Sequence, residues 1–229
     1  FKSSCRGLLF TDDGMTLYGV SSDRSFQGID ATGRTSYRVP KAHKAPINCI
    51  AALKEVGIAT GDDTGCVKIW DNRAARAAMS FNFHSDFISG LYYDENRCTR
   101  LSTAGDGILV ACDIRRSLQM QHQPTRNNNG NFGKSSSGSG DMYWASEEQQ
   151  SELQCLTVVK QGQVTVCGTQ DGAVLIFSWG QWADCSDHFP SIAESVECVL
   201  PLPNNDSALL VGSNDGMIRL VTVQVFIAP

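Results

Sequence analysis

The 229-residue sequence lacks any long apolar run. Its longest apolar stretches fall far short of the roughly 20 residues that a membrane-spanning helix needs, so we expect no membrane partner. Positive charge is scarce too. With a net charge of −5 and a pI of about 5.3, the chain has no global basic field that would draw it onto nucleic acid. A local basic strip stays compatible with these totals.

Paired cysteines of the Cys-x-x-Cys type are also absent, although the chain has nine cysteines. Several of them stand inside apolar runs, where cysteine behaves as a small core hydrophobe. The odd count and this setting favour a reducing compartment, the cytosol or nucleus, over a secreted disulfide framework.

No grouping of side chains resembles a catalytic site. The Asp residues recur at turn positions, which accounts for them without acid–base chemistry. No His pair has the spacing of a zinc site, and no Cys–His cluster occurs. The sequence therefore predicts a protein that is not an enzyme, with no metal, no cofactor and no small-molecule substrate.

What the sequence does contain is a repeat. An apolar strand, a tight turn rich in Asp and Gly, and a second apolar strand recur five times. The last strand of each copy places one residue in a common column, which consists of Ile29, Trp70, Cys112, Phe177 and Val221. The intervals are 41, 42, 65 and 44 residues, and three of the four match the period of a propeller blade.

A further apolar strand lies upstream of this pair in each copy. Hairpin signals such as Asp12-Asp13-Gly14 separate it from the strand that leads into the Asp- and Gly-rich turn. Each copy therefore predicts a small antiparallel meander. One such sheet cannot bury both of its faces, so neighbouring copies must stack. We expect an all-β fold, a single β-propeller domain over residues 1–229 with about five blades.

The 65-residue interval indicates an insertion over residues 117–150, rich in Asn, Ser and Gly. Such a composition cannot form a core, and we expect a flexible loop between blades. Its aromatic end, Met142-Tyr143-Trp144, has two interpretations. Either it docks onto the propeller or a partner, or it is a strand that resumes the fold.

The copies resemble WD repeats, in which a loop His, a strand Ser or Thr, a turn Asp and a strand Trp form a buried hydrogen-bond network. The resemblance implies a structural network in the second and third copies rather than a ligand or a base. Its members are His43, Thr60, Asp62, Asp63 and Trp70 in the second copy, and His84, Ser102 and Asp106 in the third.

Two arginines follow the last strand of these copies in an Asp-x-Arg pattern. Trp70-Asp71-Asn72-Arg73 has the form Trp-Asp-x-Arg, and Asp113-Ile114-Arg115 repeats the second half. Arg suits fixed, bidentate contacts with carboxylates and carbonyls, so Asp71, Arg73, Asp113 and Arg115 are candidate protein-interaction residues. The alternative is that each arginine pairs with the Asp of its own blade.

Several stretches resemble the WD repeat-containing protein 55 family, above all Phe177-Ser-Trp179 and Glu194-Ser-Val-Glu-Cys198. The resemblance spans nearly the whole chain. It implies a seven-bladed propeller of which this chain is a part, a nuclear or nucleolar location, and pre-ribosomal particles as partners in ribosomal RNA maturation. The Asp-x-Arg motifs are similar to those of substrate receptors of cullin-4 ubiquitin ligases, which implies the ligase adaptor as an alternative partner.

Overall fold

The computed structural model describes residues 1–53, 57–71, 76–115, 143–190, 194–203 and 205–223. These residues form five antiparallel sheets, each a meander of three or four strands in chain order. We call them blades one to five. The five repeats of the sequence are these five blades, and the all-β propeller prediction is confirmed.

The strands of the blades follow the repeats closely. Blades one and two consist of β1 (Cys5–Phe10), β2 (Thr16–Ser21), β3 (Phe26–Asp30), β4 (Thr35–Val39), β5 (Ile47–Ala52), β6 (Ile58–Asp62), β7 (Cys66–Trp70) and β8 (Ala77–Asn82). Blade three consists of β9 (Ile88–Asp94), β10 (Thr99–Ala104), β11 (Leu109–Asp113) and β12 (Tyr143–Ala145). Blades four and five consist of β13 (Leu153–Val159), β14 (Val164–Thr169), β15 (Val174–Ser178), β16 (Asp187–Phe189), β17 (Val196–Leu202), β18 (Asn205–Ser213) and β19 (Ile218–Thr222).

One turn geometry recurs in every blade, between its second and third strands. A single residue of this turn takes a positive φ between 67° and 83°, a region that favours glycine. Four blades have glycine there and blade one has an arginine: Arg24, Gly65, Gly107, Gly172 and Gly216. The Asp- and Gly-rich turns of the sequence are therefore the points that reverse the chain inside each blade.

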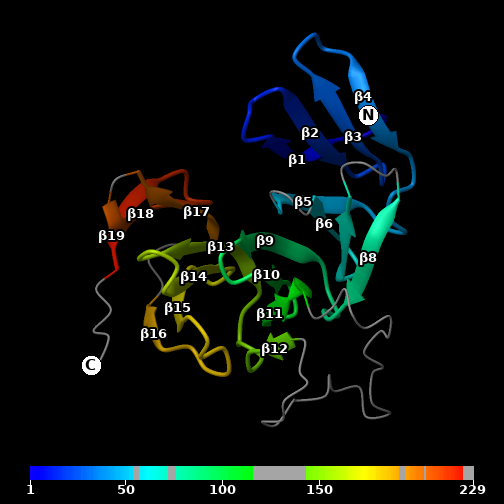
Figure 1. Ribbon diagram of the computed structural model, residues 1–229. Helices are drawn as coiled ribbons and strands as arrows, with labels where there is room; N and C mark the ends of the chain where they lie inside the picture. The colour runs from blue at the N-terminus through cyan, green and yellow to red at the C-terminus, as the bar shows by residue number, and fades with distance from the viewer. Residues whose placement is uncertain (54–56, 72–75, 116–142, 191–193, 204, 224–229) are drawn as a thin grey trace, which may run out of the picture.

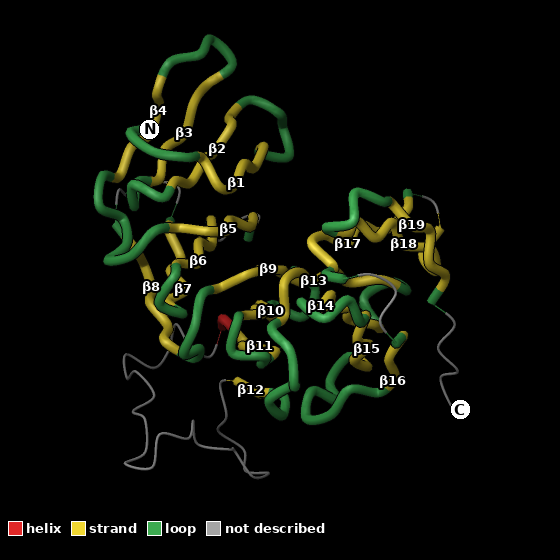
Figure 2. The backbone as a smooth tube through the Cα atoms, turned by 180° about the vertical axis from the view of Figure 1, so that it is seen from behind, coloured by secondary structure: helices red, strands yellow, loops and turns green. Residues whose placement is uncertain are grey.

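The blades follow one another in chain order around an arc (Figures 1 and 2). The first strand of each blade, β1, β5, β9, β13 and β17, lies on the inside of the arc and contacts the first strand of the next blade. The first and last blades lie apart in both views. This arrangement places all five inner strands along one concave edge.

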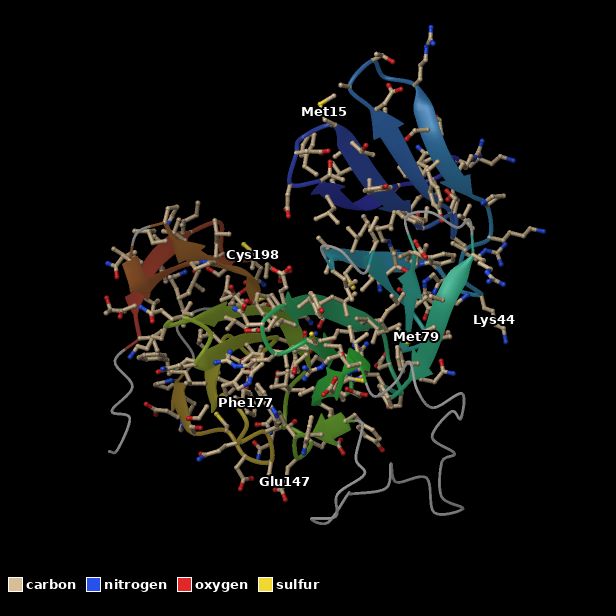
Figure 3. The ribbon with its side chains drawn as sticks, in the orientation of Figure 1. Met15, Lys44, Met79, Glu147, Phe177 and Cys198 are labelled. Carbon is tan, nitrogen blue, oxygen red and sulfur yellow. The ribbon has the colours of Figure 1, made fainter. Side chains whose placement is uncertain are left out.

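The hydrophobic core lies between blades rather than within them. Each large cluster combines side chains of two neighbours, as where Phe26 of blade one packs against Trp70 of blade two at 5.8 Å between ring centroids. Further clusters join blades two and three, three and four, and four and five. Side chains fill the space between neighbouring sheets, including Phe177 (Figure 3). Stacking therefore supplies the burial that a single blade cannot.

Apolar side chains are exposed on the two end blades. Leu8 and Phe10 of β1 are each 64% exposed, and Ile218 and Leu220 of β19 are 77% and 66% exposed. Blades with a neighbour on both sides bury the corresponding faces. The end blades thus expose several large apolar side chains on one strand each, a feature that often marks a contact site.

The insertion predicted over 117–150 lies partly outside the described residues, which resume at 143. Its C-terminal end is not a loop: Tyr143–Ala145 is β12, paired with Val110 to Cys112 of β11. Tyr143 stacks on Phe83 of blade two with ring centroids 4.4 Å apart, which explains why the aromatic end joins the sheet. Of the two interpretations of this end, the structure shows the strand. The part of the chain that the structure describes has no helix long and apolar enough to span a bilayer.

Candidate functional site

The predicted hydrogen-bond network of blade two brings four of its five residues together. His43 bonds Asp62 Oδ2 through Nδ1 at 2.7 Å and Thr60 Oγ1 through Nε2 at 2.7 Å. Trp70 Nε1 donates to the same Thr60 oxygen at 2.8 Å. All four side chains are at most 3% exposed.

The chemistry of these contacts assigns the protons. The Asp62 carboxylate can only accept, so His43 Nδ1–H donates to it. Burial lowers the pKa of His43 although Asp62 opposes the shift, so His43 is neutral and its Nε2 accepts the hydroxyl proton of Thr60. The order Asp62, His43, Thr60 resembles that of a nucleophilic triad. Here, however, the Thr60 hydroxyl is buried and hydrogen-bonded to Trp70, so a substrate could not reach it. The arrangement holds the turn of blade two against its third strand.

His43 and Asp62, together with the nearby Cys66, provide no open metal position. His43, Asp62 and Cys66 have donor atoms within 4.8 Å of one another. Both ring nitrogens of His43 are already engaged, however, and Asp62 Oδ1 accepts from the Thr64 amide at 2.9 Å and from the Cys66 amide at 3.1 Å. Burial raises the pKa of Asp62, but the hydrogen bonds from His43 and Thr64 outweigh that effect and hold the pKa below its usual range.

Blade three repeats the network without the indole. His84 bonds Asp106 at 3.2 Å and Ser102 Oγ at 2.9 Å, and the amide of Ser85 donates to Asp106 at 2.9 Å. Cys112 stands where blade two has Trp70. Burial would raise the pKa of Asp106, but the His84 hydrogen bond dominates and lowers it.

Asp63, the fifth residue predicted for the network, lies elsewhere. Its carboxylate accepts from Asn48 Nδ2 at 2.5 Å and from Arg6 at 3.2 Å, and it makes no bond to His43. Successive residues at the end of a strand point to opposite faces, so Asp62 and Asp63 cannot both reach the same histidine. Asp63 instead belongs to the concave edge of the arc.

Of the Asp-x-Arg residues, Asp71, Asp113 and Arg115 lie at or just after the end of the third strand of their blade. Arg73 is outside the described residues. Arg115 bonds the carboxylate of its own Asp113 at 3.3 Å and the carbonyl of Arg97 at 3.3 Å, and its side chain is still 62% exposed. Asp71 directly follows the third strand of blade two, at a position that corresponds to Asp113. The structure therefore gives Arg115 a local partner while leaving it accessible.

A feature that the sequence reasoning missed runs along the concave edge. Each inner strand has a β-bulge at its second residue, where the register to the next strand shifts by one. A bulge leaves one residue unpaired and redirects its side chain. The five bulge residues are all polar and come one from each blade: Arg6, Asn48, Ser89, Gln154 and Glu197. We call this row the polar rim.

Two cavities open on the polar rim. One of about 540 Å³ is lined by Arg6, Asn48, Ser89 and Gln154 of the rim, together with Asp63, Asp86, Phe87 and Ile88. The other, of about 490 Å³, is lined by Gln154 and Glu197 of the rim, together with Ser151, Gln170, Asp171, Glu194, Ser195 and Asn214. Because Gln154 lines both, the cavities are neighbours along one edge that runs from blade one to blade five.

The polar rim has an acidic character. Among the described residues that line its cavities, five are carboxylates and one is a cation, Arg6, which already pairs with Asp63. At the blade-five end, Glu197 accepts from Ser195 Oγ at 2.8 Å, and Glu194 is exposed beside it. A groove of this size and charge can hold an extended, cationic polypeptide segment.

The sequence did contain a signal for the rim. Every inner strand reads as an apolar residue, a polar residue and a small residue, as in Ile47-Asn48-Cys49 and Val196-Glu197-Cys198. One polar position that is repeated at the same place in all five copies indicates a shared orientation.

Comparisons with known proteins agree with this architecture. The family model of the WD domain, G-beta repeat, matches residues 34–71, which include β5 to β7 and the network of His43 and Trp70. The chain therefore contains a WD repeat. It is 35% identical to WD repeat-containing protein 55 of Arabidopsis thaliana over 97% of its own length and 56% of that protein. It is 32% identical to WD repeat-containing protein 55 of Homo sapiens over 96% of its length and 51% of the relative.

A fungal relative has another name. WD repeat-containing protein JIP5 of Coprinopsis cinerea is 31% identical over 97% of the WD-repeat chain and 51% of that protein. The chain therefore spans about half the length of the curated relatives it matches. The resemblance to WD repeat-containing protein 55 that the motifs indicated is confirmed. WD-repeat proteins are in general non-catalytic scaffolds that bind other proteins.

Proposed function

We propose that this WD-repeat chain is a non-enzymatic scaffold that holds proteins at its polar rim during ribosome biogenesis. The observation that carries the proposal is the row of five polar bulge residues beside two cavities. Strand pairing does not need such residues, since a bulge disrupts the ladder hydrogen bonds locally. A recognition surface accounts for them.

The charge of the rim indicates the chemistry of the partner. Five carboxylates against one paired cation favour a segment rich in Lys and Arg. Proteins of pre-ribosomal particles need such segments to neutralise RNA, and a scaffold that binds the segments would act on protein rather than on RNA. The resemblance to WD repeat-containing protein 55 supports this setting, with a nuclear or nucleolar location and a part in ribosomal RNA processing.

Depletion of the protein tests this role. Pre-ribosomal RNA should accumulate, and restoring the full-length protein should remove the accumulation. Normal processing profiles after depletion to undetectable levels would contradict the proposal. Fluorescence of a tagged protein that is excluded from the nucleus would contradict it as well.

A second candidate function is favoured by the exposed guanidinium of Arg115. In this hypothesis Asp71, Arg73, Asp113 and Arg115 contact the adaptor of a cullin-4 ubiquitin ligase, and the chain is a substrate receptor. The bond from Arg115 to Asp113 holds the side chain in place, which would lower the entropy lost on binding.

A pair of variants separates the two functions. Arg73→Ala with Arg115→Ala should abolish copurification of the adaptor if the chain is a receptor, and should leave rim partners bound. Arg38→Ala with Arg34→Ala, exposed arginines of blade one, is the matched control. Unchanged copurification of the adaptor, or its absence from the parent purification, removes the second candidate.

A further inference from the structure

Positive charge gathers on blade one of an otherwise acidic chain. Residues 1–46, which include this blade and the loop that leaves it, contain seven Lys and Arg against four Asp, whereas the whole chain has 19 basic and 24 acidic residues. Three of the cations meet at one corner of the blade. Arg24 is in the turn between β2 and β3, and Lys41 and Lys44 are in the loop from β4 to β5. We call these three residues the cationic corner.

Hydrogen bonds to the backbone hold the cationic corner together. The amide of Ala42 donates to the carbonyl of Arg24 at 2.8 Å, and the Arg24 guanidinium donates to the carbonyl of Lys44 at 3.4 Å. Lys68 of blade two supports the loop, because its Nζ donates to the carbonyl of Ala42 at 2.6 Å. The turn and the loop that carry the three cations are therefore held side by side.

Two residues of the cationic corner have a strained backbone. Arg24 has a φ of 67° and Lys41 a φ of 56°, in the left-handed region that favours glycine. The other four blades have glycine at the position of Arg24. A long cationic side chain that is retained where glycine would be less strained indicates a function for that side chain.

The charges of the cationic corner are not neutralised within the part of the chain that the structure describes. All three side chains are exposed, and Lys44 lies at the outer edge of the molecule in Figure 3. None of them forms an ion pair with another described residue. The adjacent carboxylate, Asp23, accepts instead from the Ser25 amide at 2.9 Å and from the Lys2 amide at 2.6 Å. An anion from outside the protein can therefore reach the corner.

The surroundings of the cationic corner lack apolar anchors. The large apolar side chains that are exposed among the described residues all lie before residue 16 or after residue 143. Protein interfaces usually depend on a few aromatic or aliphatic anchors that become buried, whereas contacts with the phosphates of a nucleic acid need only Lys, Arg and other hydrogen-bond donors. Clustered cations without such anchors favour a phosphate backbone over an acidic protein.

We propose that the cationic corner binds the phosphate backbone of a nucleic acid. Its three cations contact phosphates, so binding depends strongly on salt and little on base sequence. None of the three residues lines either cavity of the polar rim. The inference therefore stands apart from the proposed function: protein binds at the rim and nucleic acid at the corner.

Titration of the full-length protein with a short fluorescent oligouridylate tests the site. Lys41→Ala with Lys44→Ala should weaken binding roughly fivefold or more, and the slope of log affinity against log salt should become shallower by about 1.4, since each phosphate contact on a single strand contributes roughly 0.7. Arg34→Ala with Arg115→Ala removes the same charge at two exposed positions outside the corner and should bind as the parent does. Equal affinities for the corner variant and the parent, or equal losses in the two variants, would overturn the proposal.

Arg24→Gly separates binding from structure. Because the other blades have glycine at this position, the variant should fold, and its midpoint of thermal unfolding should not fall below that of the parent. Its affinity for the oligouridylate should nevertheless decrease roughly twofold or more. A lower midpoint would show that Arg24 is retained for structure, and an unchanged affinity would show that its charge does not contact the nucleic acid. Either result contradicts the proposal.

An oligoglutamate with the same net charge as the oligouridylate tests the other class of partner. It should bind the parent more weakly than the oligouridylate does. Tighter binding of the oligoglutamate, lost in Lys41→Ala with Lys44→Ala, would assign the cationic corner to an acidic protein and overturn the proposal.

Discussion

The indole N–H of Trp70 donates a 2.8 Å hydrogen bond to the hydroxyl oxygen of Thr60, which is completely buried. This bond connects the third strand of blade two to the second strand and, through His43, to the loop that enters the blade. Blade two therefore has the most complete anchor of the five.

Replacing the indole should weaken the fold. Trp70→Phe keeps the ring in the core but removes the donor, and we expect a loss of about 1 kcal/mol in the free energy of unfolding. Trp144→Phe in β12 is the control, since this indole is 42% exposed. Urea denaturation measures both. An equal, negligible change in the two variants would show that the Thr60 bond does not stabilise the blade.

The buried histidine makes stability depend on pH. Burial lowers the pKa of His43, so near pH 6.5 this side chain takes up a proton in the unfolded chain but not in the folded one. The free energy of unfolding should therefore fall as the pH decreases from 7 to 5. His43→Gln should flatten this slope, and His188→Gln, at an exposed position, should leave it unchanged. Parallel slopes for the parent and His43→Gln would contradict the assignment of a neutral His43.

The recurrent turn offers a matched pair of glycines. Gly65 and Gly216 have φ angles of 78° and 79°, but a Cβ at Gly65 would lie 2.4 Å from the carbonyl oxygen of His84. A Cβ at Gly216 would meet nothing within 4 Å. Gly216→Ala should cost about 1 kcal/mol for the backbone alone, and Gly65→Ala about 3 kcal/mol because the clash adds to it. Thermal unfolding of the two variants compares them, and equal losses would rule out tight packing between blades two and three at this turn.

The seven-bladed ring implied by the family resemblance predicts the behaviour of the end blades. In such a ring the 66% exposed Leu220 would face a neighbouring blade. Leu220→Ser should then cost about 2 kcal/mol in the full-length protein, the range of a core truncation. Exposed surface substitutions change stability by less than about 0.5 kcal/mol. A loss of that smaller size, measured by denaturation, would mean that no blade covers β19.

Blade two shows most clearly which structural features the sequence alone could predict. The strands, the turns and the pairing of His43 with Thr60 and Trp70 follow from local periodicity and from the WD-repeat pattern. Asp63 was misplaced because spacing cannot tell which of two adjacent carboxylates faces the histidine. The bulge at Asn48 was missed because it is a property of strand pairing, not of one strand. The strand at Tyr143 follows from its stacking on Phe83, a contact between blades that no local pattern encodes.

Charge reversal at the polar rim tests the central claim most directly. Glu194→Lys with Glu197→Lys should reduce binding of a Lys- and Arg-rich peptide, and copurification of basic partner proteins, at least tenfold, because two carboxylates of the blade-five cavity become cations. Asp184→Lys, at an exposed position that lines neither cavity, should bind as the parent does. Unchanged binding in the rim variant, with a folded protein, would contradict the assignment of the polar rim as the site that holds protein partners.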